Sequence, residues 1–270
     1  MSSARQTAIP IAKSSGRLTA EQEPFLAVRS LASNYASGYR IASHQHPWHQ
    51  LLFASSGAMT VATSRSSWMI PTGRAVFIPA RSVHAIRMWG MVEMRTLYLS
   101  PALTSFENAE CHVIEVAPLL RELILRSVER MGLDSRVPHD ERMIGLLVDE
   151  IKAAMEADTD PPLLLPMPTD ERALALAHYV LEQPLNLNGE SVDELAHQHG
   201  VARRTLERRF RDETGMSFGM WRQKACLLDS IRLLAEGKSV TDAALDSGYS
   251  SASAFIAAFK STFGYTPGRL

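Results

Sequence analysis

A run of arginines between residues 201 and 211 holds the side chains with the clearest chemical capability in this sequence. The run contains five arginines and one acidic residue, Glu207. The arginines are Arg203, Arg204, Arg208, Arg209 and Arg211. A guanidinium group can donate two hydrogen bonds to O6 and N7 of guanine or bind a phosphate, and a glutamate can accept a hydrogen bond from N4 of cytosine. A charge run by itself more often indicates a solvated surface, so the surrounding sequence has to decide.

The segment around the arginines occurs twice in the last part of the chain. The first copy runs from Glu194 to Phe218 and the second from Asp242 to Pro267. The copies align at Ala196 with Ala244, Gly200 with Gly248, Phe210 with Phe259 and Gly215 with Gly264. A helix-turn-helix needs a small residue where its helices cross, a glycine in the turn and an amphipathic second helix. Two tandem copies therefore predict two such motifs and place the arginines on a recognition helix.

In the first motif we expect a supporting helix over 192–198 and a recognition helix over 203–213. Leu206 and Phe210 lie four residues apart and must face the core. The residues that then point outward are Arg203, Arg204, Glu207, Arg208 and Arg211.

In the second motif we expect the recognition helix over 251–262, with Phe255 and Phe259 buried. Its outward residues are Ser251, Ala252, Ser253, Ala257 and Lys260. Small side chains can contact thymine methyl groups but carry little hydrogen-bond information. The first motif should therefore supply most of the base readout and the second should supply positioning.

The region from about Thr169 to Leu270 resembles the carboxy-terminal domain of the AraC/XylS transcription regulators. The resemblance rests on Arg204-Thr205-Leu206-x-Arg208-x-Phe210, Glu213-Thr214-Gly215-Met216-Ser217-Phe218 and Phe263-Gly264-Tyr265-Thr266-Pro267. It implies that residues 170–270 bind double-stranded promoter DNA in two successive major grooves. It also places Arg204, Glu207 and Arg208 at positions that reach base edges. The family usually has serine where this chain has Ala202, so the first recognition helix should lack its N-cap.

Composition and charge set broader limits. The chain has 270 residues, enough for two domains, and a net charge of −1, so only the local arginine run indicates nucleic acid. Two cysteines imply no disulfide framework. No apolar run reaches the length of a membrane span, and residues 1–24 read as a flexible tail. We therefore expect a cytoplasmic protein with no membrane partner.

The rest of the chain changes character twice. Residues 25–115 consist of short apolar runs separated by Gly, Pro and Ser, a pattern typical of a β-sandwich or small barrel. Residues 116–158 carry apolar side chains at helical spacing. The stripe Met143, Ile144, Leu147, Val148 and Ile151 is wide enough to suggest a homodimer through these helices. Residues 159–169 are rich in proline and predict an extended linker. The expected fold class is α+β with two domains, a β-barrel followed by helices and then an all-α double helix-turn-helix domain.

Two patterns in the first half resemble the cupin signatures. Gly38, His44, His46, Gln50 and Gly57 fit the first, and Gly73, Pro79 and His84 fit the second. The chain departs from them at Gln50, which replaces a glutamate, and at Arg81 and Met88. The resemblance implies a cupin-like barrel over residues 25–115 that senses a small-molecule effector. It also implies that His44, His46, Gln50 and His84 converge.

Three interpretations of that convergence stay open. The side chains could hold a divalent metal, they could line an effector pocket, or they could only satisfy buried hydrogen bonds. A metal-dependent cupin enzyme of the dioxygenase or isomerase type, fused to a DNA-binding domain, is the alternative function, and the missing glutamate argues against it. The sequence thus favours a transcription regulator that is not an enzyme, requires no other cofactor, and contacts RNA polymerase if it is an activator.

Overall fold

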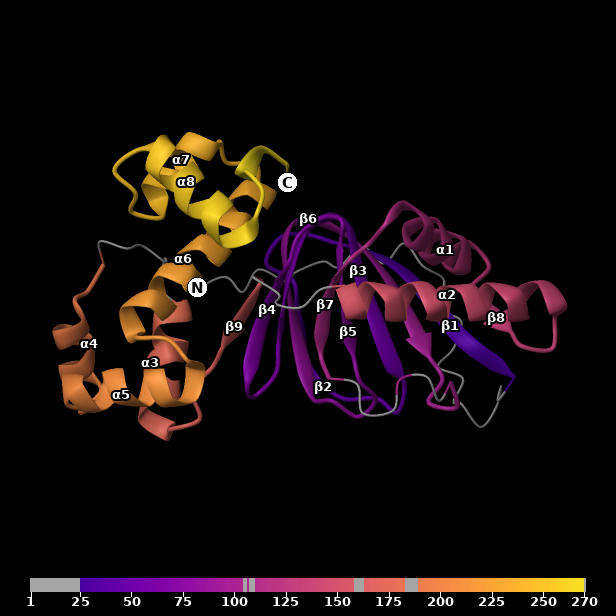
Figure 1. Cartoon of the computed structure of the whole chain (residues 1–270), viewed down its shortest axis with the longest axis horizontal. Coiled ribbons are helices and arrows are strands. Elements are labelled where there is room, and N and C mark those ends of the chain that lie inside the picture. Colours follow the sequence, from indigo (N-terminus) through magenta and orange to yellow (C-terminus); the bar gives the residue numbers. More distant parts are fainter. Residues whose placement is uncertain (1–24, 104–105, 107–109, 158–162, 183–188, 270) are drawn as a thin grey trace, which may run out of the picture. The chain divides into compact units, whose positions relative to one another are not determined.

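The computed structural model describes residues 25–103, 106, 110–157, 163–182 and 189–269, so the predicted tail over 1–24 lies outside the described residues. These residues form two compact units (Figure 1). The first takes in the described residues up to Thr60 and those between Ile70 and Pro161. The second takes in Val61–Met69 and the described residues after Pro161. The prediction of a sheet-rich domain followed by a helical domain is confirmed.

Most of the strands belong to the first unit. They are β1 (Leu26–Tyr35), β2 (Arg40–His44), β3 (His49–Ala62), β4 (Ser66–Ile70), β5 (Arg74–Ile78), β6 (His84–Leu99), β7 (His112–Glu115), β8 (Gly132–Asp134) and β9 (Leu164–Pro166). The main order is β7-β5-β3-β6-β1-β8, with β2 paired to β6 and β4 paired to β3 and β9. Strand pairs such as β1 with β6 and β3 with β5 are antiparallel.

The sheet is open, and this corrects the expectation of a closed barrel. Within the described strands, β7 and β8 end the order and do not pair with each other. Helix α1 (Pro118–Glu129) follows β7 and leads into β8, and α2 (Pro138–Ala157) follows β8. Both ends of the order therefore continue into helices. These helices cover one face of the sheet, so its apolar residues are buried without closure of a hydrogen-bonded ring.

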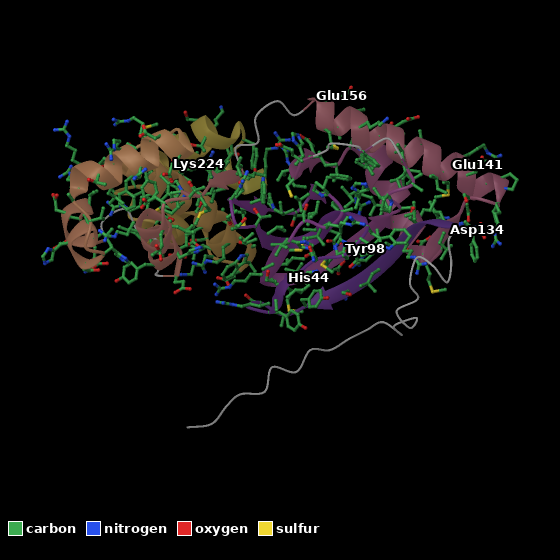
Figure 2. The ribbon with its side chains drawn as sticks, turned by 90° about the horizontal axis from the view of Figure 1, so that it is seen from below. His44, Tyr98, Asp134, Glu141, Glu156 and Lys224 are labelled. Atoms are coloured by element: carbon green, nitrogen blue, oxygen red, sulfur yellow. The ribbon has the colours of Figure 1, made fainter. Side chains whose placement is uncertain are left out.

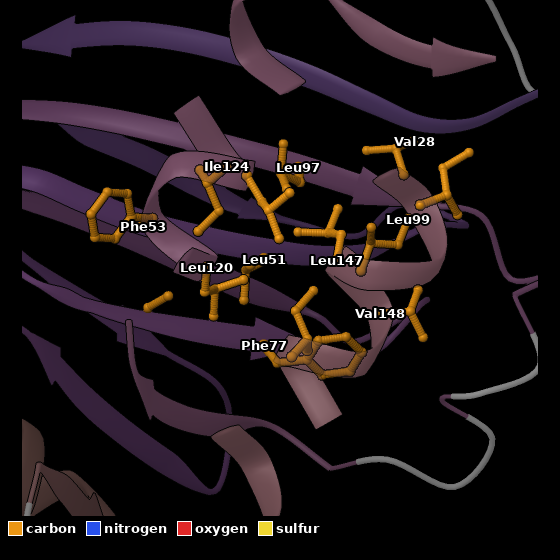
Figure 3. Close-up of a cluster of buried hydrophobic side chains, with 14 of the residues drawn as sticks. Val28, Leu51, Phe53, Phe77, Leu97, Leu99, Leu120, Ile124, Leu147 and Val148 are labelled. Carbon is orange, nitrogen blue, oxygen red and sulfur yellow. The ribbon is translucent and has the colours of Figure 1, made fainter. Parts of the chain in front are cut away.

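The main core lies between the sheet and these two helices (Figure 3). Leu51 and Phe53 of β3 contribute to it, as do Leu120 and Ile124 of α1. Full burial of one such side chain contributes about 1.5–3 kcal/mol relative to exposure. Because successive strand residues point to opposite faces, Gln50 and Leu52 project from the other side of β3.

Helix α2 turns its apolar stripe toward its own domain. The stripe residues Ile144, Leu147, Val148 and Ile151 are buried in the core, and Met143 packs against it. The argument that this stripe needs a second protomer was wrong, because the sheet and α1 already cover it.

Part of the predicted proline-rich linker is a strand. Ser66 of β4 pairs with Pro166 of β9, and Trp68 pairs with Leu164. Leu165 is buried, and the indole Nε1 of Trp221 donates to the Pro166 carbonyl oxygen at 2.8 Å. A proline lacks an N–H donor and is tolerated at a sheet edge, which is where β9 lies.

The second unit is mainly helical. Its helices are α3 (Glu171–Glu182), α4 (Val192–Gln198), α5 (Arg203–Thr214), α6 (Phe218–Ala235), α7 (Val240–Asp246), α8 (Ala252–Phe263) and a 3-10 turn at Pro267–Arg269. Serine side chains cap α4, α6, α7 and α8, whereas Ala202 gives α5 no side-chain cap. Gly215 and Gly264 end the two recognition helices in the left-handed conformation, which glycine adopts without strain. The predicted supporting and recognition helices are confirmed to within a residue or two.

The bond between Trp221 and Pro166 gives the first prediction. Trp221→Phe should lower the free energy of unfolding of the second unit by about 1–2 kcal/mol, because a partly buried carbonyl loses its donor. Urea unfolding, with hydrogen exchange of the α6 amides to localise the loss, measures this.

Trp68→Phe is the matched control. Trp68 is equally buried in the same unit, but its indole makes no hydrogen bond to the described residues. If both variants lose the same free energy of unfolding, the loss comes from the smaller ring, and the Trp221 hydrogen bond adds no stability.

Candidate nucleic-acid interface and effector site

The outer face of α5 carries three exposed arginines. Arg204, Arg208 and Arg211 are exposed and lie on one helical face, at spacings of four and three residues. Within the described part of the chain they form no ion pair or side-chain hydrogen bond. Leu206 and Phe210 are fully buried on the opposite face. The helix therefore presents three available guanidinium groups to solvent.

The other two arginines of the run have acidic partners inside the unit. Arg203 pairs with Asp193 of α4 at 2.7 Å, and both side chains are exposed. Arg209 lies 3.4 Å from Asp170 and 3.8 Å from Glu213. An exposed pair contributes at most about 1 kcal/mol, so Arg203 can leave Asp193 for a phosphate at little cost. Arg209, half-buried between two carboxylates, links α5 to the start of α3.

Glu207 is engaged within the protein. Its side chain is half-buried, and Oε2 accepts a hydrogen bond from the backbone N–H of Phe218 at 3.2 Å. Phe218 is the first residue of α6, where backbone N–H groups lack helical partners and a carboxylate is favoured. Outward spacing on α5 gave no sign of this contact, because it depends on how α6 packs against α5.

Helix α8 presents a smaller and less charged surface. Ser253, Ala257 and Lys260 are exposed, whereas Ala252 is half-buried. The Ser251 hydroxyl accepts a hydrogen bond from Ala254 N, so this residue caps the helix. The outward set predicted for the second motif thus contains one cation, Lys260.

The three sequence-predicted histidines come together in the first unit. His44 ends β2, His46 lies in the loop before β3, and His84 begins β6 directly opposite His44. The ring centroids are 4.3 Å apart for His44 and His84, 5.3 Å for His46 and His84, and 5.9 Å for His44 and His46. One nitrogen from each ring lies within 4.8 Å of the other two. We call these three residues the histidine cluster.

Backbone carbonyls fix the tautomer of every ring in the cluster. Each Nδ1 lies within hydrogen-bonding distance of a carbonyl oxygen two residues away: Ala42 at 2.9 Å from His44, Trp48 at 2.7 Å from His46 and Ser82 at 2.9 Å from His84. A carbonyl oxygen can only accept, so each Nδ1 carries the hydrogen. Each Nε2 of a neutral ring therefore keeps a lone pair.

Gln50 joins the cluster from β3. It is only 2% exposed, and its Oε1 lies 3.1 Å from Nε2 of His46. Because Nδ1 of His46 holds the hydrogen, Nε2 of His46 and Oε1 of Gln50 are both acceptors. Rotation of the amide, which exchanges its oxygen and nitrogen, or a cation between the two atoms would satisfy both.

His84 is the most deeply buried member. It is 1% exposed, and its Nε2 has no hydrogen-bond partner among the described residues. The pKa of His84 is lowered to about 4, mainly by burial and in smaller part by the neighbouring rings of His44 and His46, against the hydrogen bond to Ser82, which raises it. The imidazole is therefore neutral near pH 7 and holds an unused lone pair.

Two other residues define the surroundings of the cluster. Tyr98 of β6 meets the His46 ring edge-on, with centroids 5.2 Å apart, and sequence reasoning missed it (Figure 2 labels Tyr98 and His44). Because side chains alternate along β6 and Tyr98 lies an even number of residues after His84, the sequence could have placed both on the same face of the strand. His49, by contrast, accepts a hydrogen bond from Ala80 N and stacks on Phe77, so it points away from Gln50 as strand alternation requires.

Comparisons with known proteins cover both units. The family model for the AraC-like ligand binding domain matches residues 27–158, and that for a helix-turn-helix domain matches residues 195–270. The transcriptional regulator NimR of Escherichia coli K12 is 30% identical over 226 residues, which are 84% of this chain and 80% of NimR. RipA of Corynebacterium glutamicum, also a transcriptional regulator, is 36% identical over 104 residues, covering 38% of this chain and 30% of RipA.

Among solved structures, ToxT of Vibrio cholerae O395 aligns with 90% of this chain and 96% of its own, with a TM-score of 0.39 and 12% identity.

In the described part of this chain, no helix is both long and apolar enough to cross a membrane. The match to NimR covers 226 residues of this chain, and the two domain models match residues 27–158 and 195–270. The chain belongs to the AraC family of transcription regulators, with an AraC-like ligand-binding domain followed by a helix-turn-helix DNA-binding domain.

Proposed function

We propose that this regulator reads its operator mainly through α5 and uses α8 mainly for positioning. The observation that carries this proposal is the difference between the two outer faces. Helix α5 presents Arg204, Arg208 and Arg211 without acidic partners among the described residues, and α8 presents Lys260 alongside small side chains. Arginine can identify guanine through two hydrogen bonds, whereas alanine and serine discriminate bases weakly.

Helix α6 supports binding in two successive grooves. The α4–α5 and α7–α8 pairs pack toward opposite ends of α6 (Figure 1). Its 18 residues span about 27 Å at the helical rise of about 1.5 Å per residue. Successive major-groove faces lie about 34 Å apart on one side of the duplex. A helix of this length, together with the width of the flanking motifs, fits that spacing.

We assign effector sensing to the histidine cluster with Gln50 and Tyr98. The first unit matches the AraC-like ligand binding domain, and this cluster combines buried polar atoms with an unused lone pair on His84. A ligand that binds one conformation of the unit more tightly than another would shift the affinity for DNA by that difference. In this proposal the protein works in the cytoplasm on promoter DNA and, where it activates, in contact with RNA polymerase.

Binding is favoured over catalysis at this site. A metal-dependent dioxygenase or isomerase would use a carboxylate ligand beside its histidines, and Gln50 occupies the matching position. Within the described residues, the cluster contains three histidines and no acidic group. The full-length relative NimR is a transcriptional regulator. We therefore propose a sensor that is not an enzyme.

A homodimer through the outer side of α1 and α2 is a further part of the proposal. Of the eight large hydrophobic side chains exposed among the described residues, four lie between positions 119 and 146. They are Leu119, Met131, Val137 and Leu146. Leu146 lies on α2 and is 42% exposed, on the side away from the buried stripe. These residues differ from the stripe that the sequence suggested, and their exposed side chains are available to a second copy.

The base-reading role of α5 predicts the effect of one substitution. Arg208→Ala should weaken operator binding by about 1–3 kcal/mol and relax the preference at one base pair. Lys260→Ala should weaken binding to all sequences alike and reduce the salt dependence by roughly one phosphate contact. Gel-shift titrations on an operator found by genome-wide binding-site mapping measure both. Unchanged operator affinity of Arg208→Ala would contradict the placement of α5 in the groove.

Glu207 provides a second test of the interface. We expect Glu207→Ala to lower the free energy of unfolding by about 1 kcal/mol, because Phe218 N loses its acceptor, and Glu207→Gln to retain most of the stability through its carbonyl oxygen. Thermal unfolding combined with selection of binding sites from random DNA measures both roles. A variant of normal stability with altered preference at one base pair would show instead that Glu207 reads a base.

The homodimer proposal predicts that Leu146→Glu converts the protein to a monomer, because a charge would be buried at the interface. Light scattering after size-exclusion chromatography, at tens of micromolar protein without DNA, measures the mass. Met220→Glu, which charges an exposed hydrophobic residue of the helical unit, should remain dimeric. A monomeric wild-type protein at this concentration counts against the dimer.

A further inference from the structure

We propose that His44, His46 and His84 bind a divalent first-row transition metal through their three Nε2 atoms. This inference deepens the effector site proposed above and rests on it for its regulatory meaning. The metal binding itself depends only on the first unit, so it can be tested without DNA.

The three nitrogens are close to coordinating distance. One nitrogen from each ring lies within 4.8 Å of the other two, and a tetrahedral ion with metal–nitrogen bonds of about 2.0–2.1 Å would require separations of roughly 3.3 Å. The rings therefore have to close by at most about 1.5 Å. His44 and His46 are partly exposed, and His46 lies in a loop, so both can move toward the buried His84.

The hydrogen bonds of the cluster orient the lone pairs for metal binding. A metal-bound histidine usually donates its other N–H to a carbonyl or carboxylate, which fixes the tautomer and the ring plane. All three rings donate from Nδ1 to a backbone carbonyl, and the donor–acceptor distances are 2.7–2.9 Å. This hydrogen bond occurs in all three rings and leaves the Nε2 lone pair of each ring available to a metal ion.

The buried Nε2 of His84 is the second, independent observation. This atom has no partner among the described residues, although the side chain is almost completely buried. A buried polar atom left unsatisfied costs about 1–3 kcal/mol. A bound cation removes this cost by accepting the lone pair of this nitrogen.

The donor set selects the kind of ion. Three neutral imidazoles suit zinc, nickel, cobalt, copper or ferrous iron, whereas magnesium and calcium prefer oxygen ligands. Gln50 can add only a neutral carbonyl oxygen, which lies next to Nε2 of His46. The site therefore supplies no negative charge, and replacing Gln50 with a carboxylate should strengthen binding.

Metal titration of the full-length protein tests the inference. Protein treated with a chelator should take up one Co²⁺ or Zn²⁺ per chain, measured by elemental analysis, with the visible absorption of nitrogen-coordinated Co²⁺ and a higher Tm. Mg²⁺ at the same concentration should produce neither change. Uptake of no Co²⁺ or Zn²⁺ by folded protein would overturn the proposal.

Variants connect the uptake to the cluster. His44→Ala and His84→Ala should each reduce the affinity at least about tenfold, as expected when a ligand is lost, while Gln50→Glu should raise it by a similar factor. His139→Ala removes an exposed histidine of α2 outside the cluster and should bind like the wild type. If His84→Ala does not fold, His44→Ala and Gln50→Glu decide the result. Wild-type affinity in both would overturn the proposal.

A reporter assay separates this inference from the effector assignment. If the cluster binds metal and is the sensor, His44→Ala should also change the response of a target promoter to added metal. If the protein binds one ion through the cluster, but promoter output stays at the wild-type level in His44→Ala, the metal site stands and the effector assignment fails. If the protein takes up no metal, but the promoter response still changes in His44→Ala, the effector assignment stands and the metal site fails.

Discussion

Burial of the central strand β3 on both of its faces is the constraint on which the sensor domain depends. Gln50 to Ala54 are all buried, with Leu51 and Phe53 against α1 and α2 and with Gln50 beside the histidine cluster. A slip of one residue would place the Gln50 amide in the apolar core and Leu51 among the histidines. Pairing of Gln50 with Ile78 and of Phe53 with Ala75 holds the register. The packing of the core therefore also positions the polar site.

In the helical unit, the packing of buried side chains likewise decides which side chains face outward. Phe210 of α5 contacts Phe218 and Trp221 of α6 edge-to-face, with ring centroids 5.0 Å and 5.3 Å apart. This aromatic cluster fixes the rotation of α5, and rotation decides which side chains face outward. Arg204 and Arg208 point to solvent because Leu206 and Phe210 are held inside. The second motif has the same frame in α8, where Phe255 and Phe259 are buried, but α8 carries Lys260 as its only cation.

The connection between the two units is more extensive than one linker. The chain passes from one unit to the other between residues 60 and 61, between 69 and 70, and between 161 and 162. Residues 61–69 belong to the second unit although they continue from β3, the strand that carries Gln50 at its other end. In the second unit these residues pair with β9, whose Pro166 is bonded to Trp221 of α6. The strand that carries Gln50 in the first unit is thus continuous in sequence with the segment that pairs with β9 in the second.

The sequence by itself determined the features that depend on neighbouring residues. Helical periodicity, the turn glycines and the repeat located both recognition helices and the exposed Arg204 and Arg208, and the family resemblance indicated the missing cap at Ala202. The resemblance of the histidine spacing to the cupin signatures indicated that the members of the histidine cluster converge. Only the tertiary structure decided that the sheet is open, that the α2 stripe covers its own core, that the proline-rich segment pairs with β4, and that Glu207 bonds to α6. Each of these depends on a contact between segments that are distant in the sequence or on the packing of one helix against another. Local pattern reveals which face of an element is apolar, but not which surface will cover it.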